Sequence, residues 1–291
     1  MEKTTLILLV GEQPAPNLLP TRHLKPDMAL LVYTDRTEAI ANRLGNLLSG
    51  CQHLKVDPYD LSRIQDVLQD FLEQKFSGYR LLFNLTGGTK PMSLAAFLVA
   101  YKHQAPFMYF QTEGSHSLLY HYQFTGPGIV HLDRQEEISE TIKLDDYLRL
   151  QIGNYTKGPP RNAFEQQVYE TLQDISGLEV LSSVRPQGLE ALEVDLVIRL
   201  GNQVGVIEVK TRGAKSGIDQ IQAVAEQRYL GTYVAKFLVS GESVDLNNKN
   251  LAKAYNIEVI ELTSYTAANT LSAEDRQILT KRIRARLGGR P

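Results

Sequence analysis

Several features that would place this sequence in a specialised class are missing from it. It has one cysteine, Cys51, which excludes an intramolecular disulfide and is typical of the reducing cytoplasm. No apolar run approaches the roughly 18 residues of a membrane-spanning helix. The short apolar run at the start lacks the cleavage region of a signal peptide. We therefore expect a cytoplasmic protein without membrane contact.

Charge and histidine spacing exclude further classes. The 31 basic and 33 acidic side chains nearly balance, and a formal net charge of −2 argues against a protein that coats itself in nucleic acid. A local basic groove is still compatible with this balance. The six histidines show no spacing typical of a metal site. With 291 residues, 43% of them hydrophobic, the chain is expected to form about two globular domains.

The first half of the chain alternates apolar segments of strand length with helical ones. The expected strands are 4–10, 28–34, 53–56, 81–85, 107–110 and 118–124, and the expected helices are 37–48, 61–76 and 91–103. This order predicts a parallel, Rossmann-like sheet with helices on both faces. A polar stretch that ends in Gly-Pro-Pro indicates a boundary. We expect a first domain over 1–135, a linker over 136–160 and a second α/β domain over 161–291.

The most informative stretch runs from Glu193 to Lys210 and predicts a β-hairpin. Two runs rich in Val, Ile and Leu flank a Gly-Asn dipeptide at 201–202, which is typical of two-residue hairpin turns. With that turn, Asp195 faces Glu208 and Glu193 faces Lys210, all on one face because side chains alternate along a strand. Opposed like charges destabilise a sheet, so a cation between them is favoured. The alternative is a solvated face with ordinary surface charges.

The apolar runs at 196–198 and 204–209 favour strands that are covered on both faces. A carboxylate in a covered strand needs a partner or a metal ion. Mg²⁺ and Mn²⁺ prefer oxygen ligands, so the carboxylates of Asp195 and Glu208 and the carbonyl of Val209 suit either ion. Such an ion activates water and holds a phosphate, while Lys210 orients the nucleophile or stabilises the transition state. The set predicts metal-dependent hydrolysis of a phosphodiester.

Asp195 followed by Glu-Val-Lys on the next strand resembles the core of the PD-(D/E)xK nucleases, although Glu-Val-Asp stands where Pro-Asp is typical. In that nuclease fold a third carboxylate often comes from an upstream helix. Here Asn162 opens a helix with an apolar stripe, and Glu165 lies beside this stripe. Glu165 is either a ligand of the metal or its water, or an ordinary first-turn glutamate that the helix dipole stabilises.

The first domain carries the motif Asn-Leu-Thr-Gly-Gly-Thr-Lys-Pro-Met at 84–92. A buried strand ends there, two glycines turn the chain, and a helix begins. Main-chain N–H groups, the hydroxyls of Thr86 and Thr89 and the charge of Lys90 suit an anion. A second polar turn at 11–17 follows the first strand at the same edge, which favours a ligand site. The alternative is an ordinary strand-to-helix turn, in which Gly-Gly is common.

Together with the nuclease-like core, this motif resembles the CARF–nuclease effectors of type III CRISPR immunity over nearly the whole chain. In that family a CARF domain dimerises and binds a cyclic oligoadenylate, usually cyclic tetra-adenylate, which activates a metal-dependent nuclease domain. The resemblance implies a CARF domain followed by a restriction-endonuclease-like domain. It implies nuclease chemistry at Asp195, Glu208 and Lys210, with Glu165 as a fourth member. It implies a ligand site at Gln13, Asn17, Thr86, Gly87, Gly88, Thr89, Lys90 and Met92.

The sequence therefore predicts a homodimer that cuts DNA, RNA or both with Mn²⁺ or Mg²⁺ once a cyclic oligoadenylate is bound. One alternative is a non-catalytic sensor that regulates a partner, but opposed carboxylates beside a lysine favour the enzyme. Another is a ring nuclease that degrades its ligand in the first domain, where no catalytic group stands out. Six basic residues between Arg276 and Arg290 either line the approach of substrate phosphates or form a solvated helix face.

Overall fold

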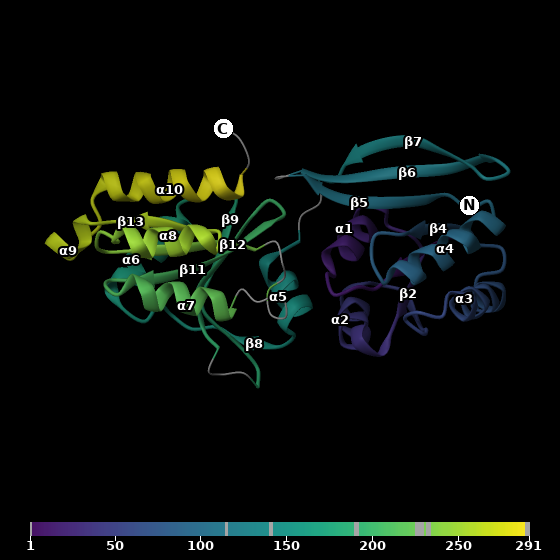
Figure 1. Ribbon diagram of the computed structural model, residues 1–291, viewed down its shortest axis with the longest axis horizontal. Helices are drawn as coiled ribbons and strands as arrows, with labels where there is room; N and C mark the ends of the chain where they lie inside the picture. The colour runs from purple at the N-terminus through teal and green to yellow at the C-terminus, as the bar shows by residue number, and fades with distance from the viewer. Residues whose placement is uncertain are drawn as a thin grey trace. The chain divides into compact units, whose positions relative to one another are not determined.

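The computed structural model describes residues 2–113, 116–139, 142–188, 192–224, 230 and 234–288. It divides into two compact units, Met1–Thr141 and Ile142–Pro291, which are drawn in Figure 1. Helix α5 (Leu144–Ile152) and the short strand β8 (Tyr155–Thr156), which lie in the stretch expected as a linker, therefore belong to the second unit. No helix in the described part of the chain is long and apolar enough to cross a membrane.

The first unit is built on a seven-stranded sheet in the order β3-β2-β1-β4-β5-β6-β7. Its strands are β1 (Thr4–Leu9), β2 (Met28–Tyr33), β3 (Cys51–Lys55), β4 (Arg80–Asn84), β5 (Phe107–Glu113), β6 (His116–Gly126) and β7 (Ile129–Glu137). The first five run parallel to their neighbours, and β6 and β7 continue the β5 edge as an antiparallel meander. The expected Rossmann-like sheet is confirmed.

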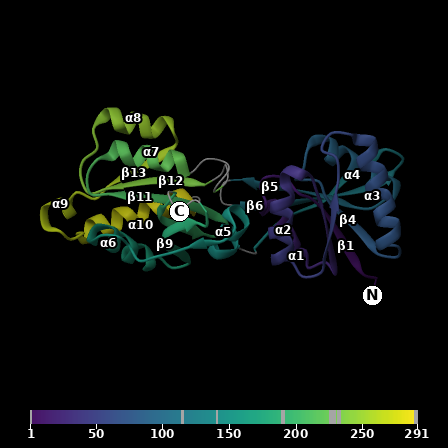
Figure 2. The same ribbon diagram turned by 90° about the horizontal axis from the view of Figure 1, so that it is seen from below.

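Helices cover both faces of this sheet. They are α1 (Ala15–Leu24), the 3₁₀ turn η1 (Asp35–Thr37), α2 (Glu38–Leu47), α3 (Leu61–Lys75) and α4 (Lys90–Lys102). On β1, Ile7 and Leu9 pack with α3 and α4, whereas the alternate residues Leu6 and Leu8 are buried on the opposite face. Figure 2 shows α1 and α2 on that opposite face. The carboxyl ends of the parallel strands therefore open into turns that lead to helices.

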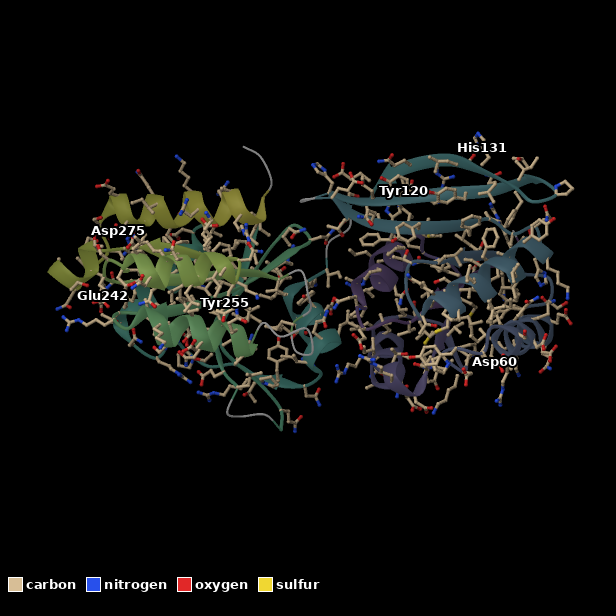
Figure 3. All side chains as sticks on the ribbon, in the orientation of Figure 1. Asp60, Tyr120, His131, Glu242, Tyr255 and Asp275 are labelled. Carbon is tan, nitrogen blue, oxygen red and sulfur yellow. The ribbon has the colours of Figure 1, made fainter. Side chains whose placement is uncertain are left out.

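The antiparallel meander is the most exposed part of the first unit. Nearly every side chain of β7 is exposed, and Figure 3 shows Tyr120 on β6 and His131 on β7 at this side. At the other edge of the sheet, Cys51 is half-buried and unpaired on β3, as a packing residue would be.

The second unit is built on a six-stranded sheet in the order β13-β12-β11-β10-β9-β8. Its further strands are β9 (Leu178–Pro186), β10 (Val194–Leu200), β11 (Gln203–Lys210), β12 (Ala235–Ser240) and β13 (Ile257–Glu261). Strands β8 to β11 pair antiparallel, and β11, β12 and β13 pair parallel. The hairpin β10–β11 therefore lies at the centre of the sheet, where the two pairing modes meet.

Helices cover both faces of this second sheet as well (Figure 2). They are α6 (Ala163–Gln173), α7 (Ala214–Val224), α8 (Leu246–Ala254), α9 (Ser264–Ala268) and α10 (Ala273–Leu287). Val197 and Val206 pack with α5, α7 and α8, whereas Leu196 and Ile207 pack with α6 and α10. Both hairpin strands are thus covered on two faces, as expected. The sequence also predicts a helix over 216–229 and a strand over 233–239, of which residues 225–229 and 233 lie outside the described residues.

Candidate functional site

The hairpin that carries the candidate catalytic residues has the predicted register. Leu200 pairs with Gln203, and the same antiparallel ladder, continued toward the other end, sets Asp195 opposite Glu208. Gly201 adopts a φ of +59°, a left-handed conformation that glycine takes without steric cost at this turn. The Gly-Asn turn and the opposed carboxylates are confirmed.

Both carboxylates are buried, and each has a defined neighbour. The main-chain N–H of Val209 donates a hydrogen bond of 2.9 Å to Oδ2 of Asp195. The ammonium of Lys210 lies 2.8 Å from Oε1 of Glu208. Asp195, Glu208 and Lys210 are therefore brought together, and Val209, between Glu208 and Lys210 in the chain, is hydrogen-bonded to Asp195.

Burial makes the charged form of Glu208 costly. It raises the pKa of this carboxyl from its ordinary value of 4.5 to about 7, and the charge of Asp195 adds to the rise, while the contact with Lys210 opposes it. Near neutral pH the chain by itself relieves the opposed carboxylates with a proton on Glu208 and the charge of Lys210. A bound divalent cation would relieve them more completely.

Glu165, at the start of α6, is close enough to the hairpin for the charge of Asp195 to act on its pKa. Asn162 caps the helix by accepting a 2.9 Å bond from the N–H of Glu165, and Oε2 of Glu165 accepts the N–H of Arg161 at 3.2 Å. Its Oε1 is buried and has no hydrogen-bond partner among the described residues. Burial raises the pKa of Glu165, and the nearby charge of Asp195 raises it further. One oxygen thus serves the helix end, while the other stays unpaired near Asp195.

Glu193 and Lys210, which the sequence places opposite each other, form no ion pair with one another among the described residues. Oε2 of Glu193 accepts a bond of 2.7 Å from Nε of Arg185 and is also contacted by Arg161. Strand β10 begins at Val194, so Glu193 lies directly before the regular strand, where Arg161 and Arg185 contact its carboxylate. Lys210 is left to pair with its own strand neighbour.

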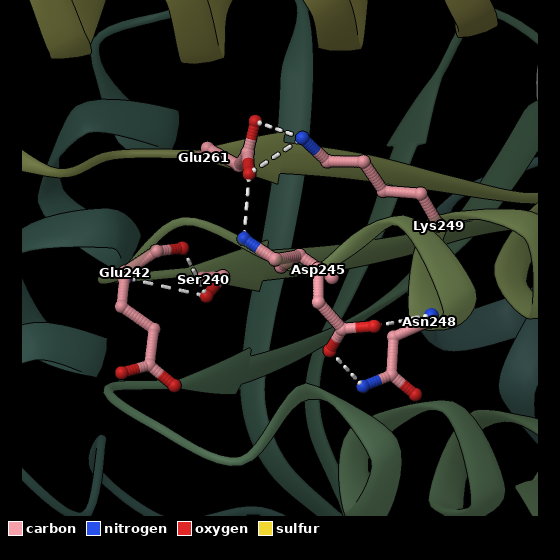
Figure 4. A network of polar contacts seen from close by, with 7 residues as sticks. Ser240, Glu242, Asp245, Asn248, Lys249 and Glu261 are labelled. Atoms are coloured by element: carbon pink, nitrogen blue, oxygen red, sulfur yellow. Dashed lines mark hydrogen bonds and ion pairs between the residues drawn. The ribbon is translucent and has the colours of Figure 1, made fainter.

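The loop after β12 supports the end of β11. The N–H of Gly241 donates to the carbonyl of Lys210 at 2.9 Å, and Glu242 accepts a 3.1 Å bond from the N–H of Gly213. Figure 4 shows the network that holds this loop: Ser240 with Glu242, Asp245 with Asn248, and Lys249 with Glu261. Lys210 is therefore carried on a strand end that neighbouring loops fix in place.

Helix α7 lies directly against the site because one of its residues is glycine. A Cβ atom on Gly217 would lie 2.6 Å from Cδ1 of Leu238 and 3.1 Å from Cγ of Lys210, with Cγ of Glu208 at 3.5 Å. The distance to Leu238 is shorter than real Cβ contacts and the distance to Lys210 is tighter than most of them, so a larger residue would displace the side chains of Leu238 and Lys210. The glycine sets how closely α7 covers Glu208 and Lys210.

The donors at this site are all oxygens. Among the described residues no three His, Cys, Asp or Glu side chains form a ready-made metal cluster. The site instead combines the opposed carboxylates of Asp195 and Glu208, and the charge of Asp195 also raises the pKa of Glu165, whose buried Oε1 has no partner among the same residues. Hard oxygen donors of this kind fit Mg²⁺ or Mn²⁺.

In the first unit the two polar turns meet at the carboxyl edge of the sheet, as expected. Nδ2 of the buried Asn84 donates to the carbonyl of Pro16 at 2.8 Å, and its Oδ1 accepts the N–H and the hydroxyl of Thr86 at 3.1 and 2.6 Å. A Cβ atom on Gly87 would lie 2.0 Å from the carbonyl oxygen of Leu9, so only glycine allows this approach. Asn84 joins the turns, and its signal in the sequence is a polar residue that ends a buried strand.

The hydroxyls of the motif serve the fold. The Thr86 hydroxyl accepts the N–H of Phe110 at 2.7 Å, in addition to its bond to Asn84. The Thr89 hydroxyl donates to the carbonyl of Pro58 at 2.6 Å and accepts the N–H of Met92 at 3.3 Å as the cap of α4. These hydroxyls fix the turn and leave its main chain and Lys90 to face a ligand.

The remaining expected ligand contacts divide into buried and exposed groups. Met92 lies in the core beneath Gly88, and Asn17 is buried with its Nδ2 donating to Leu9 at 3.0 Å, so both support the turns from below. Lys90 is exposed, and no hydrogen bond or ion pair to it is found in the described part of the chain. Nε2 of Gln13 and Oδ1 of Asn17 are buried without a partner among the same residues.

Comparison with known proteins follows the division into two units. Residues 5–147 match the family model of the Card1 CARF domain. No curated protein sequence matches the chain. The structure is similar to that of Can2 from Sulfobacillus thermosulfidooxidans in complex with cyclic tetra-adenylate, with a TM-score of 0.74, 17% identity, and coverage of 97% of this chain and 98% of that chain.

Two further solved structures are similar. Protein VC1899 from Vibrio cholerae aligns with a TM-score of 0.74 and 13% identity, over 98% of this chain and 99% of that chain. A type III CRISPR defence DNA nuclease activated by cyclic oligoadenylate aligns with a TM-score of 0.61 and 18% identity, over 82% of this chain and 45% of that chain. At such low identities the likeness is one of fold.

Proposed function

Because the first unit of this chain is a CARF domain, matched over residues 5–147, we propose that the protein is an endonuclease that a cyclic oligoadenylate activates. The proposed activator is cyclic tetra-adenylate, the molecule in the Can2 complex. The proposed nuclease is the second unit, a restriction-endonuclease-like domain of the PD-(D/E)xK type that cuts DNA, RNA or both.

The observation that carries this proposal is the buried, opposed pair Asp195 and Glu208 beside Lys210. Two carboxylates held together out of water destabilise the folded chain unless a cation joins them. The unpaired oxygen of Glu165 adds a further buried donor near Asp195. Such an arrangement does not stabilise the fold by itself, so a catalytic role is the best explanation for its presence in this chain.

Each residue has a role that follows from its contacts. Asp195, Glu208 and the carbonyl of Val209 would hold a divalent cation, with Glu165 as a further oxygen donor to the ion or its water. Such an ion would supply an activated water and screen the charge on the phosphate. The N–H of Val209 fixes Oδ2 of Asp195 and thereby orients that carboxylate. Lys210 has three N–H donors, of which Glu208 occupies one, so the others are available to phosphate oxygens.

Activation begins at the CARF domain. The main-chain N–H groups of the turn at 86–90, the Lys90 ammonium and the Gln13 amide bind the activator. A homodimer presents each of these groups twice, which suits a cyclic ligand with an even number of phosphates. The ligand activates the nuclease to the extent that it prefers one arrangement of the dimer over another.

The test is a cleavage assay with the full chain. Labelled DNA and RNA, single- and double-stranded, are incubated with Mg²⁺, Mn²⁺ or EDTA, each with and without cyclic tetra-adenylate. The proposal expects cleavage that requires both the ion and the activator. Binding of cyclic tetra-adenylate without cleavage of any substrate would instead identify a non-catalytic sensor. Disappearance of the activator itself would identify a ring nuclease.

A further inference from the structure

Two arginines share one carboxylate next to the proposed nuclease centre, and the chemistry above uses neither of them. Nε of Arg185 donates to Oε2 of Glu193 at 2.7 Å, and Arg161 contacts the same oxygen. The Glu193 side chain is 9% exposed, whereas those of Arg161 and Arg185 are 49% and 42% exposed. The cluster therefore has one positive charge in excess, and its guanidinium groups reach solvent.

This cluster adjoins the carboxylates through covalent and hydrogen-bonded links. Glu193 lies two residues before Asp195 in the chain, directly before the start of β10. The main-chain N–H of Arg161 donates to Oε2 of Glu165 at 3.2 Å. The arginine cluster is thus linked directly to the segments that carry two of the proposed catalytic carboxylates, Asp195 and Glu165.

The main chain holds the two arginines near each other without any ligand. The hydroxyls of Ser182 and Ser183 on β9 donate to the carbonyls of Gly158 and Pro159 at 2.7 and 3.0 Å. The N–H of Gly158 in turn donates to the carbonyl of Ser182 at 3.2 Å. The segment that leads to Arg161 is therefore fastened to the strand that carries Arg185, and the pair is preorganised.

The arginines keep donors for a further partner. A guanidinium has five N–H donors in a planar fork that matches two oxygens of a phosphate. Arg185 contacts Glu193 through its Nε, and Arg161 contacts the same carboxylate through one Nη. Ion pairs as exposed as these contribute little to stability, so stabilisation alone gives a weak reason for two arginines on one carboxylate.

Resting on the proposed nuclease function, we propose that Arg161 and Arg185 form a clamp for the phosphodiester backbone of the substrate strand. Glu193 sets the position of both guanidinium groups. The clamp binds phosphates beside the one that is cut, so it acts on substrate affinity, and the bond-breaking step is left to the carboxylates and Lys210.

The test measures how salt weakens substrate binding. Full-length protein with Asp195→Asn, which leaves the strand intact, is titrated against labelled single-stranded DNA and RNA with cyclic tetra-adenylate and Mg²⁺ over a range of salt concentrations. Removing one phosphate contact should lower the magnitude of the slope of log affinity against log salt by about 0.7 and weaken binding roughly tenfold. We expect this result for Arg161→Ala and for Arg185→Ala, and a retained slope for Arg185→Lys.

Arg134→Ala is the matched control, because Arg134 is 54% exposed and is paired with Asp133 on β7, in the first unit of the chain. Its slope should equal that of the parent. A parent slope in Arg161→Ala and Arg185→Ala, with a lowered melting temperature, would overturn the clamp and make the cluster purely structural. If the otherwise unmodified protein neither binds nor cuts nucleic acid, that result contradicts the proposed nuclease function, and the clamp proposal that rests on it is contradicted as well.

Discussion

Asp195 and Val209 lie on the two strands of one hairpin and are joined by a 2.9 Å hydrogen bond from the Val209 N–H to the Asp195 carboxylate. The bond fixes the orientation of the Asp195 carboxylate and links it to Val209, the residue that precedes Lys210. It also separates two roles of the aspartate, because an asparagine can accept the same hydrogen bond without the charge.

Because the hydrogen bond and the charge of Asp195 can be removed separately, two substitutions of this residue should change the free energy of unfolding differently. In metal-free protein, Asp195→Asn keeps an acceptor for Val209 and removes one of two opposed charges, so the free energy of unfolding should be unchanged or higher. Asp195→Ala leaves the buried N–H of Val209 unpaired and should cost about 1–3 kcal/mol. Urea unfolding in EDTA measures both. Equal destabilisation by the two changes would contradict the role assigned to the hydrogen bond.

The raised pKa of Glu208 predicts how stability depends on pH. Burial raises this pKa from 4.5 to about 7, so the folded chain holds the proton more tightly than the unfolded chain over that interval. The contribution of Glu208 to the free energy of unfolding therefore falls as pH rises from 4.5 to 7, by about 3 kcal/mol, and then levels off.

Glu208→Gln removes this titration and serves as the comparison. The difference in unfolding free energy between the variant and the natural chain should grow in favour of the variant through the same pH interval, in metal-free buffer. Other acids titrate in both proteins and cancel in the difference. Parallel curves from pH 4 to 8 would show that Glu208 keeps an ordinary pKa.

Gly217 predicts a steric effect on the site. Gly217→Ala places a methyl group against Leu238 and Lys210, which should lower stability by about 1–3 kcal/mol and displace the lysine. The activator-dependent cleavage rate should fall more than stability alone explains. Asp219→Ala, at an exposed position of the same helix, is the control and should change neither quantity. A fully active Gly217→Ala protein would show that α7 does not define the site.

Lys90 predicts a loss of ligand binding without a loss of stability. It is exposed at the first turn of α4, and a phosphate contact there should be worth roughly tenfold in affinity for cyclic tetra-adenylate. Lys102→Ala, at the other end of the same helix, controls for a general change in charge. Calorimetric titration of both variants measures the difference. Equal affinities would remove Lys90 from the ligand site.

The parts of the fold that the sequence reveals are those with strong local signals. The Gly-Asn turn between two apolar runs predicts β10 and β11, and further apolar runs of strand length predict the parallel sheet of the first unit. Three elements lack such signals. Helix α1 contains Pro16 and Pro20 and buries five consecutive residues, so it shows no apolar stripe. Strand β7 is exposed almost throughout, and β9 is interrupted by Ser182 and by Ser183 with a φ of +48°.

The site shows the same limit. Asp195, Glu208 and Lys210 are close in the hairpin, so alternation along two strands is enough to bring them together. The partners of Glu193 come from segments about 8 and 32 residues away, and no local pattern encodes those contacts. The Gly-Gly motif likewise predicts a turn at a sheet edge, but not that Met92 and Asn17 point into the core. Which side of a turn faces a ligand is decided by tertiary packing.

The most direct test of the account is one cleavage measurement on two proteins. The natural chain and Asp195→Asn are mixed with the substrate that the natural chain cuts, in Mn²⁺, before and after addition of cyclic tetra-adenylate. The account predicts that the activator switches on cleavage in the natural chain, that Asp195→Asn cuts at least about 100-fold more slowly, and that both bind the activator equally. Equal, activator-dependent cleavage by the two proteins would contradict it, because the nuclease centre would then lie elsewhere.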